Sequence, residues 1–218
     1  MNNRGAFIAI EGPIGVGKTT LATILNDHFG YTLLREIVEE NPFLSKFYTD
    51  IKEYALQTEA FFLFNRLKQL EDIEKNVLSK SKGVVSDYHI IKNLIFSGIT
   101  LDKVQFHKYK QMYNIFVNDL PQPDIIIYLN SDTDVLMKRI AMRDRSFERQ
   151  MARNYINELS LEYKYYFNPL SIKHNFMGKE PIIIEVDNSN LDFLNNDDDR
   201  HFIVSKVEQA IKTLGGQA

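Results

Sequence analysis

The sequence of 218 residues contains no cysteine, which excludes disulfides and thiolate metal sites and is typical of an intracellular protein. It also lacks a basic excess, because 26 Lys and Arg residues face 29 Asp and Glu residues, for a net charge of −3. We therefore expect neither a nucleic-acid partner nor a membrane partner. No apolar run reaches 18 residues, and an apolar strand pattern starts too near the N-terminus for a signal peptide. A cytoplasmic protein is predicted.

Linkers rich in Gly, Ser or Pro and internal repeats are missing as well. With 44% hydrophobic residues, the chain is long enough to fill one core. A single α/β domain spanning residues 1–218 is the simplest organisation.

Residues 12–19 match the pattern G-x-x-x-x-G-K-[ST] of a phosphate-binding loop. An apolar strand pattern precedes the loop and a helical pattern follows it, which is the setting that this motif requires. The loop amides and the helix N-terminus would bind phosphate oxygens, Lys18 would reach the β- and γ-phosphates, and Thr19 would ligate Mg²⁺. The expected ATP-binding residues of this stretch are Gly12, Pro13, Ile14, Gly15, Val16, Gly17, Lys18, Thr19 and Thr20.

Five short apolar runs without alternation indicate strands that are buried on both faces. They cover residues 6–10, 31–35, 83–86, 124–129 and 181–186. Helical patterns lie between them and predict a doubly wound parallel sheet, in which ligands bind at the carboxyl ends of the strands.

Two carboxylates stand at such ends. Glu36 follows the second strand, where it could act as general base toward an attacking hydroxyl. Asp87 ends the third strand, as a carboxylate partner of Mg²⁺ would. Glu39 and Glu40 are more typical of a solvated face.

The longest helical pattern covers residues 52 to about 80, and its apolar positions extend too far around the helix for one buried stripe. One face should pack on the sheet, and another could form a dimer interface. Glu59 and Arg66 lie two turns apart on one face; an exposed pair of charges remains an equal alternative. The aromatic residues of a second helical stretch, 102–120, fit a core or an interface.

Four arginines fall within residues 139–149, and guanidinium groups suit phosphoryl oxygens. We expect a mobile, arginine-bearing lid at about residues 139–150. The acidic run 195–199 is interpreted as a solvated turn before a last helix over residues 201–214.

Together these segments resemble the deoxynucleoside kinase family, and within it the bacterial branch that acts on deoxyguanosine. The matching segments are I-E-G-P-I-G-V-G-K-T-T at 10–20, E-I-V-E-E-N-P-F at 36–43, F-Y at 47–48, F-F-L-F-N-R-L-K-Q-L-E-D at 61–72, S-D-Y-H-I-I-K-N at 86–93 and R-I-A-M-R-D-R-S-F-E at 139–148. The resemblance runs from about residue 6 to residue 193. It implies a P-loop kinase fold, with a five-stranded parallel sheet, helices on both faces and an arginine-bearing lid.

The resemblance also implies roles for the residues that match. Glu36 would be the general base for the 5′-hydroxyl, and Asp87 the acidic residue associated with Mg²⁺. Tyr48 and Glu148 would hold the deoxyribose 3′-hydroxyl. The remaining matches concern ATP: Arg139, Arg143 and Arg145 on the phosphates, and Asp192 and Phe193 against the adenine.

Two positions depart from the family pattern. Tyr88 stands where many relatives carry an arginine that orients substrate and base, which leaves that role unassigned or shared by Arg145 or Arg35. Glu59 stands where relatives read the nucleobase with glutamine. A carboxylate accepts the N1–H and N2–H₂ donors of guanine together, Arg66 could donate to O6 and N7, and Asn93 offers an amide donor.

The sequence therefore predicts an ATP- and Mg²⁺-dependent kinase that converts deoxyguanosine to dGMP in nucleoside salvage. Its small-molecule partners would be a deoxynucleoside and ATP. The chain would form a homodimer through its long helices, or a heterodimer with a paralogous kinase. A deoxyadenosine or broad deoxynucleoside kinase is the alternative. A nucleoside monophosphate kinase such as thymidylate kinase, or a GTPase-like switch or silent binder, fits less well, because cations for an acceptor phosphate and an N-K-x-D motif are missing.

Overall fold

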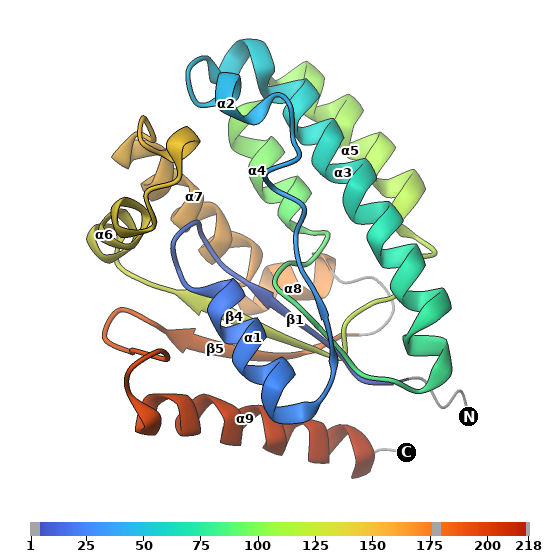
Figure 1. Cartoon of the computed structure of the whole chain (residues 1–218). Helices are drawn as coiled ribbons and strands as arrows, with labels where there is room; N and C mark the ends of the chain where they lie inside the picture. The colour runs from blue at the N-terminus through green and yellow to red at the C-terminus, as the bar shows by residue number, and fades with distance from the viewer. Residues whose placement is uncertain (1–4, 176–179, 217–218) are drawn as a thin grey trace.

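The computed structural model describes residues 5–175 and 180–216, and at its centre lies a five-stranded sheet (Figure 1). The strands are β1 (Phe7–Glu11), β2 (Thr32–Leu34), β3 (Val84–Ser86), β4 (Ile125–Asn130) and β5 (Ile182–Asp187). Their order is β2-β3-β1-β4-β5, and all four pairs are parallel. Each strand begins and ends within one residue of its predicted range. The expected parallel sheet is confirmed.

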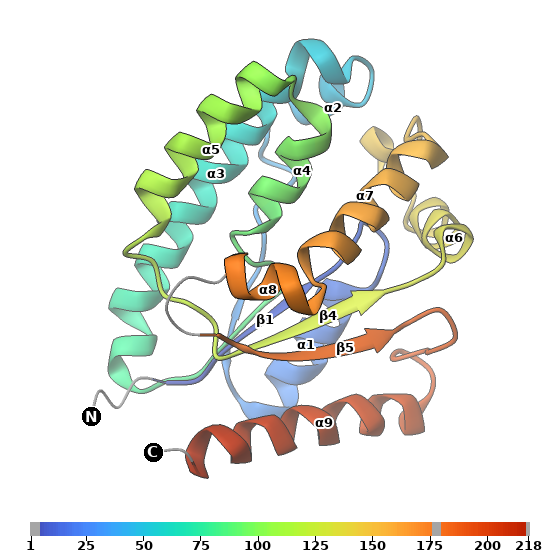
Figure 2. The same cartoon turned by 180° about the vertical axis from the view of Figure 1, so that it is seen from behind.

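Helices lie on both faces of this sheet and beyond its edge. The helices of the described residues are α1 (Lys18–Phe29), α2 (Leu44–Phe47), α3 (Ile51–Asn76), α4 (Lys92–Thr100), α5 (Lys103–Val117), α6 (Thr133–Arg143), α7 (Arg153–Tyr166), α8 (Pro169–Asn175) and α9 (Asp197–Gly216), with the 3₁₀ turns η1 (Leu78–Lys80) and η2 (Ser146–Glu148). Helix α1 packs on β1, β2 and β3, and α9 packs on β5. Helices α7 and α8 lie on the face opposite α1 (Figure 2). There Tyr128 of β4 stacks on Tyr163 and Phe167, with ring centroids 6.3 and 4.7 Å away.

The last helix differs from its predicted range. It begins at Asp197 instead of residue 201, so Asp197, Asp198 and Asp199 form its first turn and are not a solvated turn before it. The Asn196 side chain accepts the Asp198 N–H at 3.0 Å. Carboxylates are favourable at a helix N-terminus, where the macrodipole is positive. The prediction of a solvated turn at these aspartates was therefore wrong, because they form the start of helix α9.

Helices α3 and α5 lie side by side and extend outward from the sheet (Figures 1 and 2). Asp50 caps α3 by accepting the Glu53 N–H at 3.2 Å, and Asp102 caps α5 by accepting the N–H groups of Val104 and Gln105, both at 2.8 Å. The two caps explain why both helices begin within one residue of the predicted position. Helix α3 ends at Asn76, earlier than expected, because a 3₁₀ turn follows it.

None of the helices in residues 5–175 and 180–216 combines the length and the apolar character needed to cross a membrane.

Candidate active site

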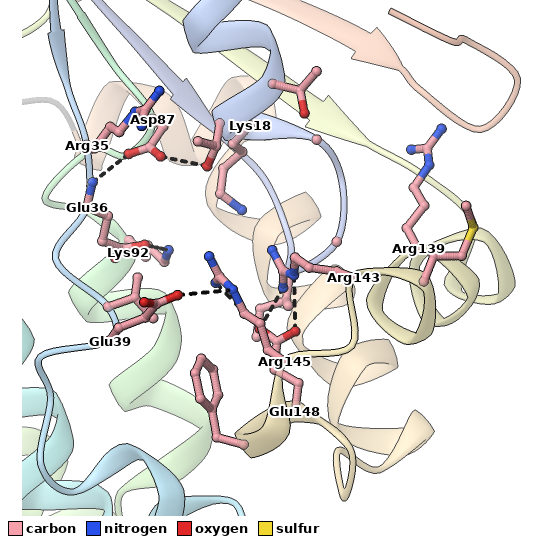
Figure 3. A pocket seen from close by; sticks show the side chains of 18 of the residues that line it. Lys18, Arg35, Glu36, Glu39, Asp87, Lys92, Arg139, Arg143, Arg145 and Glu148 are labelled. Atoms are coloured by element: carbon pink, nitrogen blue, oxygen red, sulfur yellow. Dashed lines mark hydrogen bonds and ion pairs between the residues drawn. The ribbon is translucent and has the colours of Figure 1, made fainter. Parts of the chain in front are cut away.

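A cavity of about 1180 Å³ opens at the carboxyl ends of the central strands. Its walls come from the phosphate-binding loop, the segment after β2, helices α3 and α4, the end of α6 and the segment after β5 (Figure 3). A pocket for one small molecule measures about 300–1000 Å³. This cavity therefore has room for two ligands side by side.

The phosphate-binding loop has the backbone that its glycines permit. Gly12 and Gly17 have φ angles of 145° and 100°, a region that residues with a Cβ rarely adopt. A Cβ on Gly12 would lie 2.2 Å from the carbonyl oxygen of Leu129. Lys18 donates from Nζ to the carbonyl oxygens of Gly12 and Pro13, at 2.6 and 2.9 Å. Burial, followed by the nearby charge of Lys92, lowers the pKa of Lys18 to about 7.

The loop residues divide into two groups. Six line the cavity: Ile14, Gly15, Gly17, Lys18, Thr19 and Thr20. Gly12, Pro13 and Val16 are buried beneath them, and the Gly12 N–H is directed at the Glu11 carboxylate, 3.1 Å away. These three predicted ATP-binding residues face the protein core and support the loop from the side away from the cavity.

The two predicted metal-binding residues meet at the edge of the loop. The Thr19 hydroxyl donates to Oδ2 of Asp87 at 2.7 Å, and Oδ1 of Asp87 accepts the backbone N–H of Glu36 at 2.8 Å. Within residues 5–175 and 180–216, no group of three or more metal-ligating side chains occurs. Mg²⁺ commonly takes one or two protein oxygens and completes its shell with phosphates and water, so this pair fits such an ion.

Glu36 lies just past β2, where it was predicted, and its carboxylate is bound by two cations. Oε1 accepts two N–H groups of Arg66, from Nε at 3.1 Å and from Nη2. Oε2 accepts from Nζ of Lys92 at 2.6 Å. Burial by itself would raise the pKa of Glu36, but Lys92 and Arg66 outweigh it and hold that pKa at about 2. The carboxylate is therefore ionised and fixed in place.

Sequence reasoning missed Lys92. It also left open whether Arg35 or Arg145 takes the orienting role that Tyr88 cannot. In the structure Lys92, four residues after Tyr88, binds Glu36 together with Arg66. The sequence held a signal, because Lys92 stands between the apolar pairs 90–91 and 94–95, which indicate a buried segment. In the structure Lys92 is 6% exposed. A buried lysine needs a partner for its charge.

Glu11 is a second residue to which the sequence motifs assigned no role. It ends β1 and is fully buried. Its Oε2 accepts from the Tyr163 hydroxyl at 2.8 Å, and its Oε1 accepts the His89 N–H. Because Glu11 also binds the Gly12 N–H, it links the start of the phosphate-binding loop to the segment after β3.

Glu59 and Arg66 are 2% and 3% exposed, which excludes the alternative that they form a solvated pair. Both line the cavity. Oε1 of Glu59 accepts from the Thr100 hydroxyl at 3.2 Å. Burial raises the pKa of Glu59 to about 8, although the charge of Arg66 opposes the shift.

Asn93 lies behind Arg66 and is fully buried. Its Oδ1 accepts from Nη1 of Arg66 at 2.6 Å, and its Nδ2 donates to the Tyr109 hydroxyl at 2.7 Å. These contacts lie within the protein, and Asn93 is not among the residues that line the cavity. Its contact with the nucleobase stays a prediction. Asn93 orients the guanidinium of Arg66, because its own amide on α4 is held by the Tyr109 hydroxyl of α5.

Two arginines of the predicted lid converge on Glu148, which is 5% exposed (Figure 3). Arg143 binds it through Nε at 3.2 Å and Nη2 at 2.6 Å, and Nη1 of Arg145 lies 3.8 Å from Oε1. Tyr48 also lines the cavity, and its ring stacks on Phe147 at 6.3 Å. Glu148 and Tyr48, the two predicted sugar-binding residues, thus share one wall.

Arg139 points away from the other two arginines in Figure 3. Its Nη2 donates to the carbonyl oxygens of Asn188 and Leu191, at 3.0 and 3.1 Å. It thereby holds the segment after β5, whose Asp192 and Phe193 line the cavity. Arg139 also lines the cavity, but its hydrogen bonds stabilise the segment after β5, beside the proposed adenine site.

Comparison with protein families places almost the whole chain in one of them. The family model described as deoxynucleoside kinase matches residues 8–212. A deoxyguanosine kinase of Bacillus subtilis is 43% identical over 209 residues, covering 96% of this chain and 99% of that protein. A deoxyadenosine/deoxycytidine kinase of the same organism is 31% identical and covers 74% and 76% of the two chains.

Solved structures agree with the fold. A deoxyadenosine kinase from M. mycoides, with dCMP and a flexible dCDP bound, superimposes with a TM-score of 0.78 at 26% identity. The match covers 93% of this chain and 99% of that chain. The same enzyme with bound dATP gives a TM-score of 0.78 at 25% identity. The sheet and helices described above are therefore those of a P-loop kinase.

Proposed function

The chain belongs to the deoxynucleoside kinase family, and from this premise we propose that its preferred substrate is deoxyguanosine, converted to dGMP in nucleoside salvage. The observation that carries the proposal is a shared cavity. The phosphate-binding loop, the carboxylate of Glu36 and the buried Glu59 all line it. A donor nucleotide and an acceptor nucleoside can thus lie end to end between the loop and α3.

The chemistry assigned to Glu36 is proton acceptance. The 5′-hydroxyl oxygen forms a bond to the γ-phosphorus as its proton passes to Glu36, and the bond to the β–γ bridging oxygen breaks, with the electron pair leaving on ADP. A carboxylate with a pKa of about 2 is a weak base. That strength suffices where the transition state is loose and the hydroxyl loses its proton late. Positioning and charge balance then supply most of the catalysis.

Mg²⁺ and the cations would act on the ATP phosphates. Thr19 and Asp87 would hold the ion, which neutralises charge on the β- and γ-phosphates when bound. Lys18 would exchange its loop carbonyls for phosphate oxygens, which would restore its charge. Arg143 and Arg145 are assigned to the transferring phosphoryl group, and Arg139 to the donor side of the cavity.

Recognition of guanine is assigned to α3. An ionised Glu59 would accept N1–H and N2–H₂ together, whereas adenine and cytosine place an acceptor at the corresponding ring nitrogen. Arg66 lines the same wall. Three of its five N–H donors bind Glu36 and Asn93, which leaves one N–H on each terminal nitrogen for the purine. Tyr48 and Glu148 are assigned to the 3′-hydroxyl.

A deoxyadenosine or broad deoxynucleoside kinase is the second candidate, favoured by the protonation of Glu59. With a pKa of about 8, its carboxyl group is mostly neutral at pH 7. A neutral acid donates one hydrogen bond and accepts another, which suits N1 and the amino group of adenine. Bound guanine would instead favour the ionised form.

We further propose a homodimer formed by the outer faces of α3 and α5. Phe64 and Phe116 contact each other edge to face at 5.8 Å, yet they remain 48% and 45% exposed. Leu56 and Ile115 are further exposed apolar residues of the same two helices, at 41% and 72% exposed. Phe64→Asp should produce a monomer in sedimentation analysis. A heterodimer with a paralogous kinase would be revealed by mixing the two purified chains.

A cytoplasmic location is also part of the proposal, supported by the absence of cysteine and by the use of ATP. Fractionation of cells that express the chain tests it.

The experiment that tests the function is a nucleoside panel. The purified chain is incubated with ATP, Mg²⁺ and each of the common deoxynucleosides, and kcat/KM is measured for each. Deoxyguanosine should rank first and yield dGMP. A higher kcat/KM for deoxyadenosine would support the second candidate, and turnover of a monophosphate alone would contradict both.

A further inference from the structure

Lys92 is a buried cation for which the residues matched to the family supply no role. It begins α4, is 6% exposed and lines the cavity. Its Nζ lies 2.6 Å from Oε2 of Glu36 and 5.3 Å from the centroid of the Phe96 ring. A lysine removed from water in this way needs a compensating charge, and the compensating charge here is the proposed general base.

The two oxygens of Glu36 are occupied differently. A carboxylate oxygen offers two lone pairs. Oε1 accepts two N–H groups, both from Arg66, while Oε2 accepts one, from Lys92. Oε2 is therefore the oxygen with a lone pair left for a substrate hydroxyl.

We infer that Lys92 is a positioning residue of the phosphoryl transfer, which holds Glu36 so that Oε2 takes the proton of the 5′-hydroxyl. The inference rests on the proposed role of Glu36. Lys92 fixes the rotation of the carboxylate from the side opposite Arg66. In the reaction, the proton moves from O5′ to Oε2, and the Lys92 ammonium keeps its own protons throughout.

Other charged groups also surround this pair. From the segment around β1 come Glu11 and Lys18, from α3 come Glu59 and Arg66, and from the end of β3 comes Asp87. Lys92 and Arg66 are the cations that keep the pKa of Glu36 low against burial. Without Lys92, one of the two cationic contacts that hold the Glu36 carboxylate is lost.

The test replaces Lys92 by methionine, which keeps the length without the charge, and by arginine, which keeps the charge. Lys212→Met, on the exposed side of α9, is the matched control. We measure kcat and both KM values with deoxyguanosine and ATP. For Lys92→Met, kcat should fall about 100-fold, as expected for a misplaced group, with KM for ATP within about threefold.

The split between kcat and KM and the rescue by arginine separate positioning from mere support of the fold. In Lys92→Met the loss should fall on kcat, because the Glu36 carboxylate is misplaced while the ATP-binding loop is unchanged. Lys92→Arg should recover most of kcat. A folded Lys92→Met enzyme with kcat within about threefold of the parent, or a Lys92→Arg enzyme as slow as Lys92→Met, would overturn the inference.

A double variant covers the case in which Lys92→Met folds poorly. Lys92→Gln keeps a hydrogen-bond donor, and it is combined with Glu36→Gln. If Lys92 acts through Glu36, the double variant is no slower than Glu36→Gln alone; additive losses would contradict the inference. Failure of the proposed function would look different, because the unmodified chain would then leave deoxyguanosine unphosphorylated.

Discussion

Arg66 binds Glu36 through two of its N–H groups, although 30 residues separate them in the chain. A third donor of the same guanidinium binds Asn93 at 2.6 Å. Arg66 therefore connects the helix that carries Glu59 to the carboxylate proposed to accept the substrate proton. The residues proposed for base recognition and for proton transfer are thus neighbours in one buried network, and each proposal can be tested separately.

Removing the proton acceptor should stop turnover while leaving the fold intact. We expect Glu36→Gln to lower kcat by about 10²–10⁴-fold, the usual contribution of a general base, because the amide keeps the shape but cannot take the proton. Steady-state kinetics with deoxyguanosine and ATP measure the effect. Glu71→Gln, at an exposed position of α3, serves as control. Near-normal turnover by Glu36→Gln would reject Glu36 as base.

Changing Glu59, the residue proposed to recognise the nucleobase, should alter substrate preference more than the rate of turnover. Glu59→Gln loses one of two acceptors for guanine, so the preference for deoxyguanosine over deoxyadenosine should fall by about 1–3 kcal/mol, or roughly 5- to 150-fold. A competition assay with both nucleosides gives the ratio directly. Gln57→Ala, on the exposed side of α3, should leave the ranking as it is. An unchanged ranking in Glu59→Gln would remove Glu59 from recognition.

The same preference should depend on pH. Burial raises the pKa of Glu59 to about 8, so the carboxyl group is neutral below that pH and ionised above it. The ionised form accepts the two guanine donors, and the neutral form suits adenine. The ratio of kcat/KM for deoxyguanosine to that for deoxyadenosine should therefore rise between about pH 7 and 9. In Glu59→Gln, which cannot titrate at this position, the ratio should not change with pH. An equally constant ratio in the parent chain would contradict the proposed titration of Glu59.

Magnesium dependence should be sensitive to Asp87. Asp87→Asn keeps the hydrogen-bond acceptor for Glu36 N–H but weakens the ligand set beside Thr19. We expect the Mg²⁺ concentration for half-maximal rate to rise by about 10–100-fold, the effect of disturbing groups around a metal. Rates are measured at fixed ATP over a Mg²⁺ series, with the exposed Asp119→Asn as control. Equal Mg²⁺ curves for Asp87→Asn and the parent would exclude the assignment.

Substitution of two glycines should separate the cost of backbone strain from the cost of a steric clash. Gly12 and Gly30 both have positive φ, 145° and 66°, but a Cβ would meet the Leu129 carbonyl oxygen at 2.2 Å only at Gly12 and open space at Gly30. Gly30→Ala should cost about 1–2 kcal/mol of unfolding free energy. Gly12→Ala should cost more and should also impair ATP binding. Urea denaturation compares them; equal losses would show that the close approach at Gly12 relaxes easily.

The sequence by itself determined the sheet and the donor end of the site. Buried parallel strands are short apolar runs, and the phosphate-binding loop is contiguous, so both can be read from neighbouring residues. Its glycines at 12 and 17 do adopt positive φ. Glu36 and Asp87 could be placed because the carboxyl ends of parallel strands converge at one edge of the sheet.

Only the tertiary structure decided which side chains pair. Lys92 reaches Glu36 across 56 residues and Tyr163 reaches Glu11 across 152, and no local pattern encodes such partners. Glu59 and Arg66 could equally have been solvated, since a helical spacing gives a face but not what covers it. The fold buries them between α3, α4 and α5, and burial is what turns ordinary charges into a fixed network, because removal from water makes each charge depend on a specific partner.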